Sequence, residues 1–536
     1  MTLLAMLLLA SGVLVLRAAR PERAADVVLS PHWQDHAWYQ LDDHDSIALC
    51  ELPAGARYRL VIGCLGDSAE ECTVRLRLTP RTAHRTQACR TIRDVAQISA
   101  AKRRRNLAGG DNPRSCNKQD DQAPEGRRLN SQRESSVAPS GLTNRFIEFS
   151  VGSRPRLNSA ATSWLTKPEQ PIGTAREFFL HVTDGDLDDP KQYARITARS
   201  VACGHRVRVF IDQQLPDGEV PQSRIEELMQ TLETDVIPRI ESQFGTLQDV
   251  DHDGRFAVVL TPWLSRLQGG RTSIGGMVRS SDFRLDVPPP LGNRGDMLFL
   301  NSALPSDPAL RDLLSHEVAH AACISQRLVG QDGKLSEEED WLSEALAHMA
   351  EPGWSNLDHR LAAFLEEPSR YPLVVPDYYR AGLWRNPGCR GATFLFTRWC
   401  VERHGPDLVR RLVESRTSGT LNLARATGRA FEDLFREWSL SLASGDELTT
   451  LDLQAVLDRL GSRGLRPTPF SGDANHEQSL RVRGTAFTVV ELRRESSESR
   501  ALRIVGDSAA RWQFSICRIP DDLPSEKNAV PLVANH

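Results

Sequence analysis

The sequence predicts a mixed α+β protein of several domains, in which a strand-rich lobe and a helical lobe are flanked by β-rich modules at both ends. Three observations predict this fold class. The chain has 536 residues, which is more than one hydrophobic core usually serves. Short runs of alternating apolar and polar residues fill both ends of the chain. Between about residues 205 and 445, strand-like segments come first and segments with helical spacing follow.

Composition sets broad limits on function. Hydrophobic residues make up 40% of the chain and charged residues 25%, as in ordinary globular proteins. The net charge of -4 argues against a nucleic-acid surface. The ten cysteines are an even number, which fits an oxidising compartment with disulfides. Cys64 and Cys72 flank a predicted turn and could form one of them, although a longer-range pairing is equally allowed.

Residues 1–25 are predicted to be a signal peptide or a short anchor. Leu3 to Leu16 is almost entirely apolar and is followed by Arg17 and Arg20. An apolar run of this length suits the core of a signal peptide better than a membrane span of about 20 residues. The protein is therefore expected to be exported, either secreted or in the cell envelope. An uncleaved anchor would attach it to the membrane or cell surface.

The two flanking modules are predicted from alternation. Residues 27–200 form a β-rich accessory domain, with strands such as 58–63, 73–78 and 177–182. A disordered insertion interrupts it at 101–142, where a basic run precedes many Gly, Asn, Gln, Ser and Pro residues. Residues 446–536 form a small β-rich C-terminal module, with strands near 487–492 and 512–517.

The central domain, residues 205–445, is predicted to begin with strands. The segment 206–211 is the first strand, and an amphipathic helix from about Ser223 to Phe244 follows it. Further strands are expected at 255–261 and 296–300. A helix then begins near Pro308, and a second helix ends near Glu351. The helical lobe continues to about residue 445.

The segment His316-Glu317-Val318-Ala319-His320 carries the chemistry. Two histidines four residues apart lie on one face of a helix, so both imidazoles can reach one zinc ion. Glu317 lies beside them as a general base for a water molecule. A catalytic zinc takes three protein ligands and keeps its fourth position open. The motif is short, so its neighbours must supply the third ligand.

Glu344 is the predicted third ligand. It lies 24 residues after His320, on a second helix whose apolar residues recur at helical spacing. Glu344 is at the edge of that apolar face, where an acidic side chain needs a partner such as a metal. The metzincin pattern fails, because Cys323 and Gln326 stand where it needs Gly and His. Cys323 is too far along the helix to share an ion with His316.

The HEVAH motif, followed by Trp341-Leu342-Ser343-Glu344-Ala345, resembles the gluzincin metallopeptidases (the HExxH-plus-Glu class that includes thermolysin). A closer resemblance is to secreted bacterial peptidases of the hyicolysin type, in which an Asp-rich turn and a strand precede the zinc helix. The match here is Asp249 to Gly254 followed by 255–262. The resemblance covers about residues 205–445 and implies a zincin fold and peptide hydrolysis. Relatives carry Gly at the place of Ala345.

The same resemblance leaves the surroundings of the ligands unassigned. Thermolysin-like enzymes have, at the place of His348, an Asp that orients a zinc-binding histidine. Asp249, Asp251 and Asp253 have the spacing of a Ca²⁺ loop. Leu260 stands where an EF-hand needs Glu, so a turn without an ion is the favoured interpretation and a Ca²⁺ site the alternative.

The predicted function is that of a secreted zinc-dependent endopeptidase acting on protein or peptide substrates. Glu317 would take the proton of the attacking water and pass it to the leaving amine. An oxyanion stabiliser is expected from the helical lobe, with Tyr379 ahead of Tyr378 and His404. The alternatives are a zinc hydrolase of a non-peptide bond and a catalytically silent surface-binding protein. The sequence gives no indication of oligomeric state.

Overall fold

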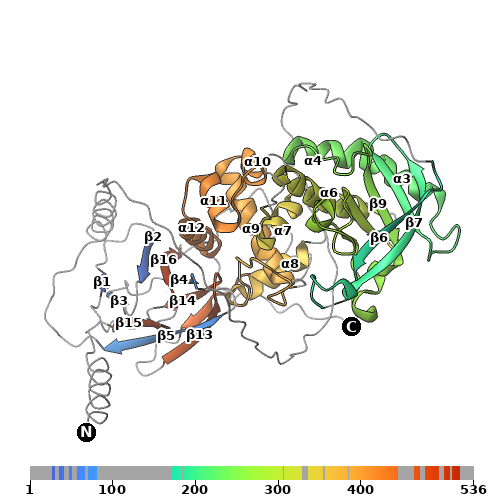
Figure 1. The fold of residues 1–536 in the computed structure, drawn as a ribbon. Helices are drawn as coiled ribbons and strands as arrows, with labels where there is room; N and C mark the ends of the chain where they lie inside the picture. The colour runs from blue at the N-terminus through green and yellow to red at the C-terminus, as the bar shows by residue number, and fades with distance from the viewer. Residues whose placement is uncertain are drawn as a thin grey trace, which may run out of the picture.

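The structure is a computed structural model that mixes α and β elements in more than one domain (Figure 1). It describes residues 27–29, 36–41, 47–50, 57–66, 70–80, 171–183, 185–305, 307–328, 336–353, 357–383, 386–444, 464–470, 477–493, 500–507 and 510–519. The predicted signal peptide or anchor at 1–25 and the predicted insertion at 101–142 lie outside these residues. No helix of the described part is long and apolar enough to cross a membrane.

A six-stranded mixed sheet forms the strand-rich lobe. Its order is β10-β11-β9-β8-β7-β6, with β8, β9 and β11 parallel and the other neighbours antiparallel. The bounds are β6 (Ala175–His181), β7 (Tyr193–Cys203), β8 (Val207–Asp212), β9 (Phe256–Thr261), β10 (Gly276–Met277) and β11 (Met297–Asn301). Every residue of β8, β9 and β11 is buried, as expected of central strands covered on both faces. The short strand β10 is left at one edge.

Two helices between β8 and β9 replace the single amphipathic helix predicted for Ser223 to Phe244. They are α3 (Gln222–Thr231) and α4 (Ile237–Phe244), joined by a π-helical stretch at Leu232–Val236. Pro238 has no N–H group to donate into the preceding turn, which explains why the α-helical hydrogen-bond pattern is interrupted here. The chain still continues in one direction, and its apolar side packs into the core.

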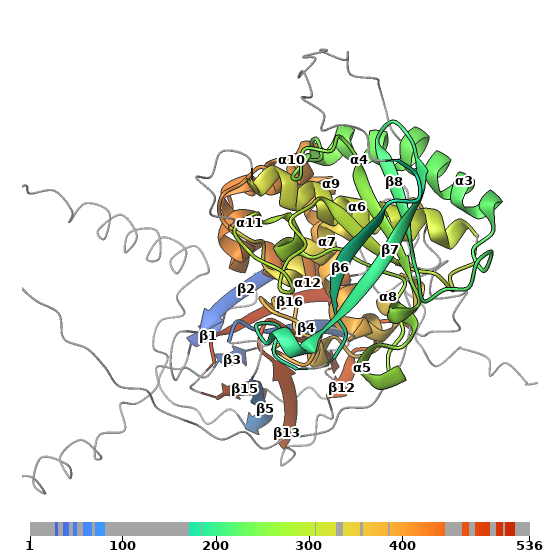
Figure 2. The same ribbon diagram turned by 45° about the vertical axis from the view of Figure 1, so that its right-hand side comes forward.

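The helical lobe follows the sheet along the chain and lies beside it (Figures 1 and 2). Its helices are α6 (Pro308–Leu328), α7 (Asp340–Met349), α8 (Asp358–Glu366), α9 (Pro387–His404), α10 (Asp407–Val413), α11 (Gly419–Thr427) and α12 (Phe431–Ser444). One hydrophobic core joins α6, α7 and α9 to the sheet. Helices α6 and α7 are the two that the sequence predicted to carry the metal ligands.

Two five-stranded sheets form a separate β-sandwich. Their orders are β1-β3-β15-β5-β13 and β12-β14-β4-β16-β2, and their facing residues share one core. The early strands are β1 (Val27–Leu29), β2 (His36–Leu41), β3 (Ile47–Cys50), β4 (Arg57–Cys64) and β5 (Glu71–Pro80). The late strands are β12 (Thr468–Phe470), β13 (Glu477–Arg483), β14 (Phe487–Arg493), β15 (Arg500–Gly506) and β16 (Trp512–Ile519).

Strand pairing crosses the predicted domain boundaries. Residues 27–200 were expected to form one accessory domain and 446–536 another. Instead, β15 lies between β3 and β5, and β16 lies between β4 and β2, so both ends of the chain build one sandwich. Strands β6 and β7, expected in the accessory domain, pair with β8 in the sheet of the central domain. Alternation marks a strand but does not name its partner, which explains the difference.

The sandwich packs against the helical lobe through aromatic side chains. Phe487 of β14 contacts Phe364, Phe435 and Trp438, with ring centroids 5.6–6.3 Å apart. Gly63 of β4 lies directly under Phe435, where a Cβ atom would be 2.9 Å from the ring. These residues belong to the core of the helical lobe.

The disulfide that Cys64 and Cys72 could form is not present. Both side chains are buried free thiols. Cys64 ends β4 in one sheet of the sandwich and Cys72 begins β5 in the other. Burial raises the pKa of the Cys64 thiol to about 12, so it stays protonated and unreactive near neutral pH.

Replacing Gly391 with alanine is expected to destabilise the helical lobe. Helices α8 and α9 approach so closely that a Cβ atom at Gly391 would lie 2.1 Å from the carbonyl oxygen of Arg360. Because backbone must move, we expect the free energy of unfolding to fall by about 2–3 kcal/mol. Denaturant unfolding measures it. Gly66→Ala is the control, since its nearest contact would be an ordinary 3.5 Å; equal stability of both variants would contradict the packing.

Candidate metal centre

Helix α6 carries the HEVAH motif through the core. Asp307 precedes the helix, and its carboxylate accepts hydrogen bonds from the N–H groups of Ala309 and Leu310 at 2.8 and 3.2 Å. Pro308, which needs no hydrogen-bond partner for its nitrogen, takes the first helical position. His316 and Glu317 are buried, and His320 is partly buried. The motif is therefore on a rigid element whose start is fixed by a cap.

Three side-chain atoms converge between α6 and α7. His316 Nε2 and His320 Nε2 are 3.1 Å apart. Glu344 Oε2, from α7, is 3.4 Å from His316 Nε2 and 3.9 Å from His320 Nε2. Burial is the main cause that holds the pKa values of both imidazoles well below their usual value. Both rings are therefore neutral at pH 7, the form in which histidine binds a metal.

These distances suit one tetrahedral ion. Zinc bonds of about 2.0–2.1 Å to histidine nitrogen and carboxylate oxygen place neighbouring ligand atoms about 3.3 Å apart in a tetrahedron. The three measured separations lie around that value. The donor set of two imidazoles and one carboxylate is also the usual set of a catalytic zinc with an open fourth position. The residues present therefore fit zinc.

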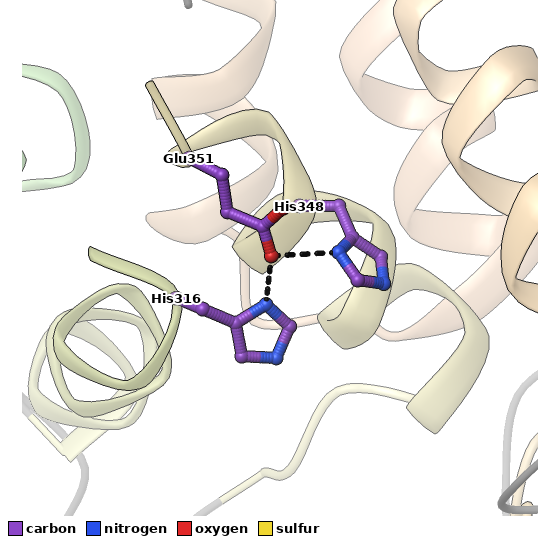
Figure 3. Close-up of side chains that lie close together, drawn as sticks. All are labelled: His316, His348 and Glu351. Atoms are coloured by element: carbon purple, nitrogen blue, oxygen red, sulfur yellow. Dashed lines mark hydrogen bonds and ion pairs between the residues drawn. The ribbon is translucent and has the colours of Figure 1, made fainter. Parts of the chain in front are cut away.

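Glu351 contacts His316 on the ring nitrogen that faces away from the other two ligand atoms. Its Oε1 atom is 2.6 Å from His316 Nδ1 and 2.8 Å from His348 Nδ1 (Figure 3). If His316 donates its Nδ1–H to this carboxylate, its Nε2 lone pair is left for the metal. The sequence left the orienting group unassigned, because His348 stands where thermolysin-like enzymes have Asp. The structure supplies a carboxylate three residues later.

Arg360 completes this network. Its Nη1 atom is 2.6 Å from His348 Nε2, so that nitrogen accepts a hydrogen bond and the ring is protonated on Nδ1. Burial, followed by the charge of Arg360, keeps the pKa of His348 well below its usual value. Hydrogen bonds thus run from Arg360 through His348 to Glu351 and meet the one from His316.

His316, His348 and Glu351 form a second group of residues that could hold a metal. The separations of 2.6 and 2.8 Å are hydrogen-bond lengths and are shorter than the edges of a tetrahedral zinc site. In addition, both nitrogens approach the same oxygen of Glu351. The arrangement is better explained as a hydrogen-bond network behind the first group.

Glu317 lies on the side of the site that faces the sheet. Its side chain is buried against β10, where a Cβ atom on Gly276 would be 2.9 Å from Glu317 Cγ. The absence of a side chain at Gly276 allows the edge strand to come this close. Burial raises the pKa of Glu317 to about 8, partly opposed by a hydrogen bond from the backbone of Val278. A raised pKa is typical of carboxyl groups that exchange protons near neutral pH.

Arg390 is another site residue that the sequence did not reveal. It lies in the first turn of α9, and its Nη1 atom forms an ion pair with Glu344 Oε2. Its guanidinium carbon is 5.0 Å from the ring centroid of Tyr378. Burial lowers the pKa of Arg390 to about 10, so it keeps its charge at pH 7. Glu344 therefore has a cationic neighbour in the protein as well as a place among metal ligands.

The three candidates for the oxyanion stabiliser have contacts of their own. The hydroxyl of Tyr379 donates to the carbonyl of Gly185 at 2.9 Å, in the connection that follows β6 at the sheet edge opposite β10. Tyr378 is fully buried beneath Arg390. His404 ends α9, about 21 Å along the helix from Arg390. None of these contacts places a hydroxyl or imidazole at the three converging atoms.

The acidic turn before β9 is closed by protein contacts. Asp249 accepts hydrogen bonds from the N–H groups of Asp253 and Gly254, both at 3.1 Å. Asp251 pairs with Arg176 at 2.9 Å. The three carboxylates are close enough to share a cation. These contacts account for the turn without an ion, so the geometry gives the Ca²⁺ alternative no further support.

No protein-family model matches the chain, and no curated protein matches it either. Among solved structures, it is similar to a variant of a two-domain M1 zinc metallopeptidase bound to L-arginine, with 12% identity and a TM-score of 0.20 over 55% of this chain and 62% of that one. The L-tryptophan complex of such a variant gives 11% identity and a TM-score of 0.21 over 55% and 62%.

A third structure, an M1 zinc metallopeptidase variant from Deinococcus radiodurans bound to Tyr-Ser-Ala, has 12% identity and a TM-score of 0.20 over 55% of this chain and 63% of that one. The chain thus covers less than two thirds of each neighbour. These neighbours are gluzincin peptidases, and none is described as hyicolysin-type. Scores this low carry no argument, so the functional conclusion rests on the geometry of the site.

Proposed function

We propose that the protein is a zinc-dependent peptidase whose metal ligands are His316, His320 and Glu344. The observation that carries the proposal is the convergence of two Nε2 atoms and one carboxylate oxygen at separations of 3.1–3.9 Å. Glu317 lies next to His316 on the same helix. When bound, zinc would polarise the scissile carbonyl and lower the pKa of a water molecule towards 7.

The chain's own residues then divide the remaining tasks. A carboxylate oxygen of Glu317 accepts the proton of the attacking water and later donates it to the leaving amine. Glu351 fixes the ring of His316 so that Nε2 faces the metal. The absence of a side chain at Gly276 lets the edge strand pack directly against Glu317.

The edge strand favours a peptide over other substrates. Strand β10 is the last strand of its sheet and lies against Glu317. An extended peptide can pair with the backbone of an exposed edge strand, and a sugar or lipid ester has no matching set of N–H and C=O groups. We infer an endopeptidase for this reason. Export from the cell stays a prediction drawn from residues 3–16.

Removal of the metal tests this function. We expect the purified full chain to bind one zinc ion and to cleave fluorescently labelled casein. A chelator such as 1,10-phenanthroline should abolish cleavage, and added zinc should restore it, because the site holds the ion by only three ligands. Metal content and casein cleavage are measured on the same sample. Stoichiometric zinc without cleavage of casein or of a peptide library would contradict a peptidase and favour a non-peptide substrate or a silent site.

A further inference from the structure

The proposed reaction needs a donor for the developing oxyanion. Attack of water forms a C–O bond and moves the carbonyl π electrons onto the oxygen, while the water proton passes to Glu317. Collapse restores the carbonyl and breaks the C–N bond, and the proton returns to the departing amine. A fixed N–H or O–H group directed at the carbonyl oxygen lowers the barrier in both steps. The tyrosine hydroxyl expected there, that of Tyr379, donates to Gly185 instead.

Arg390 is a cation held beside the metal ligands. Its contact with Glu344 Oε2 places it next to an atom that is 3.4 Å from His316 Nε2. Only 14% of its side chain is exposed. A guanidinium has five N–H donors in a planar fork, so it can contact a carboxylate and a second oxygen at once. Arg390 is therefore an N–H donor that lies next to one of the proposed metal-ligand atoms.

Arg390 is held rigidly. Asn386 caps α9 by accepting a hydrogen bond from the N–H group of Cys389 at 3.1 Å, and Pro387 occupies the first helical position. The ring of Tyr378 supports the guanidinium from the other side, 5.0 Å from its centroid. A donor that is fixed before the reaction loses no energy to reorganisation when charge appears.

Arg390 and Glu317 come from different sides of the site. Glu317 packs against β10 of the sheet, whereas Arg390 belongs to α9 and contacts Glu344 and Tyr378 of the helical lobe. A scissile carbonyl next to the three converging atoms would therefore have the proton acceptor on one side and the cation on the other. General base and oxyanion donor need this arrangement, because they act on different atoms of the same bond.

We propose that Arg390 is the oxyanion-binding catalytic residue of this site and takes the part expected of Tyr379. The inference rests on the proposed peptidase function. It predicts that loss of Arg390 impairs the reaction without impairing metal binding. Removing a positive charge beside two neutral histidines and Glu344 should leave zinc affinity unchanged or increase it, because like charges repel.

The test uses the full chain carrying Arg390→Gln or Arg390→Lys, with Arg410→Gln on the exposed face of α10 as the control. For a quenched fluorogenic peptide containing a casein bond that the wild type cleaves, kcat should fall about 10²–10³-fold in Arg390→Gln while KM changes little. Arg390→Lys should recover part of the loss. Zinc affinity, measured by competition with a chromophoric chelator, should not weaken in either variant.

A second measurement separates catalysis from structural support. A peptide phosphonamidate, which imitates the oxyanion, should lose affinity in proportion to the loss of kcat/KM, and a cleaved-product peptide should not. Equal losses for both ligands, weaker zinc binding, or a kcat within threefold of the wild type would overturn the inference. If wild type cleaves peptides and Arg390→Gln cleaves them equally well, only this inference fails. If zinc-loaded wild type cleaves none, the proposed function fails and takes the inference with it.

Discussion

Replacing Glu317 with glutamine is expected to reduce peptide hydrolysis by about 10³-fold or more while zinc stays bound. Glutamine has nearly the same shape and can still accept the hydrogen bond from Val278, but it cannot take a proton from water. The three ligand atoms come from other residues, so zinc content should not change. Casein cleavage and zinc content of the same preparation give both results.

Glu414→Gln is the matched control for this variant. Glu414 directly follows α10, pairs with Arg410 and is 49% exposed, so its substitution removes a carboxylate without touching the core. We expect full activity from it. Hydrolysis by Glu317→Gln at the wild-type rate would refute the role of Glu317 as the general base. Loss of zinc together with activity would mean that the substitution acts through the ligands instead.

The difference in stability between metal-free wild type and Glu317→Gln is expected to depend on pH. Burial raises the pKa of Glu317 from its ordinary 4.5 to about 8. Between these values the folded protein retains a proton that the unfolded chain has released, so a rise in pH favours unfolding. Relative to Glu317→Gln, metal-free wild type should lose at most about 1.4 kcal/mol of stability per pH unit in this window. Denaturant unfolding at about pH 5 and pH 8 measures this loss, and a pH-independent difference would contradict it.

The second large effect is expected from Glu351→Gln. The glutamine oxygen can still accept hydrogen bonds from His316 and His348, but an amide is a weaker acceptor than a carboxylate and does less to make His316 a strong ligand. We expect zinc affinity to fall about 10–100-fold. Competition with a chromophoric chelator measures the affinity, with Glu414→Gln as the control. At saturating zinc, much of the activity should return.

Glu351→Gln should also make the metal-free protein less stable. Glu351 is the buried carboxylate at the end of the network that begins with the buried guanidinium of Arg360. Without it, the positive charge of Arg360 is left poorly compensated in the core. Unchanged zinc affinity would show that the orientation of His316 does not depend on this carboxylate. Near-UV circular dichroism of the metal-free variant distinguishes that outcome from general unfolding.

The metal ligands could be predicted because their relation is local. His316 and His320 are one helical turn apart, and Glu344 stands out as an acidic residue at the edge of an apolar helix face. Both features are visible in the spacing of residues. The structure brings the three side chains together at the predicted place. Their role as ligands stays a prediction until the metal is measured.

The residues around the ligands could not be predicted in the same way. Arg390 lies 46 residues after Glu344, on a helix whose sequence carries no metal-binding pattern, and only tertiary packing brings the two together. Glu351 could more easily have been predicted, because a buried acidic residue just after the helix that carries Glu344 is unusual. The sequence comparison looked for the orienting residue at His348 instead, because thermolysin-like enzymes carry Asp at that place. Nothing in the sequence around Tyr379 indicated that its hydroxyl would donate to Gly185.

The pairing of strands in the sandwich could not be predicted from the sequence, for a physical reason. Each strand of the sandwich shows its alternation locally, but pairing of β15 with β3 and β5 depends on residues more than 400 positions apart. No period or motif connects them. The mixed α+β class could therefore be predicted, and the division into domains could not.

The shared sandwich has a consequence for biosynthesis. Strands β1 to β5 leave the ribosome first, but their neighbours β12 to β16 are translated last. The intervening 171–444 contain their own sheet and helices and most of one hydrophobic core, so this region can fold while β4 and β5 still lack their strand neighbours. The two sheets of the sandwich are completed only when the late strands β12 to β16 pair with the early ones. A chain released before β13 is translated would contain the assembled candidate metal site and unpaired strand edges, which are prone to aggregate.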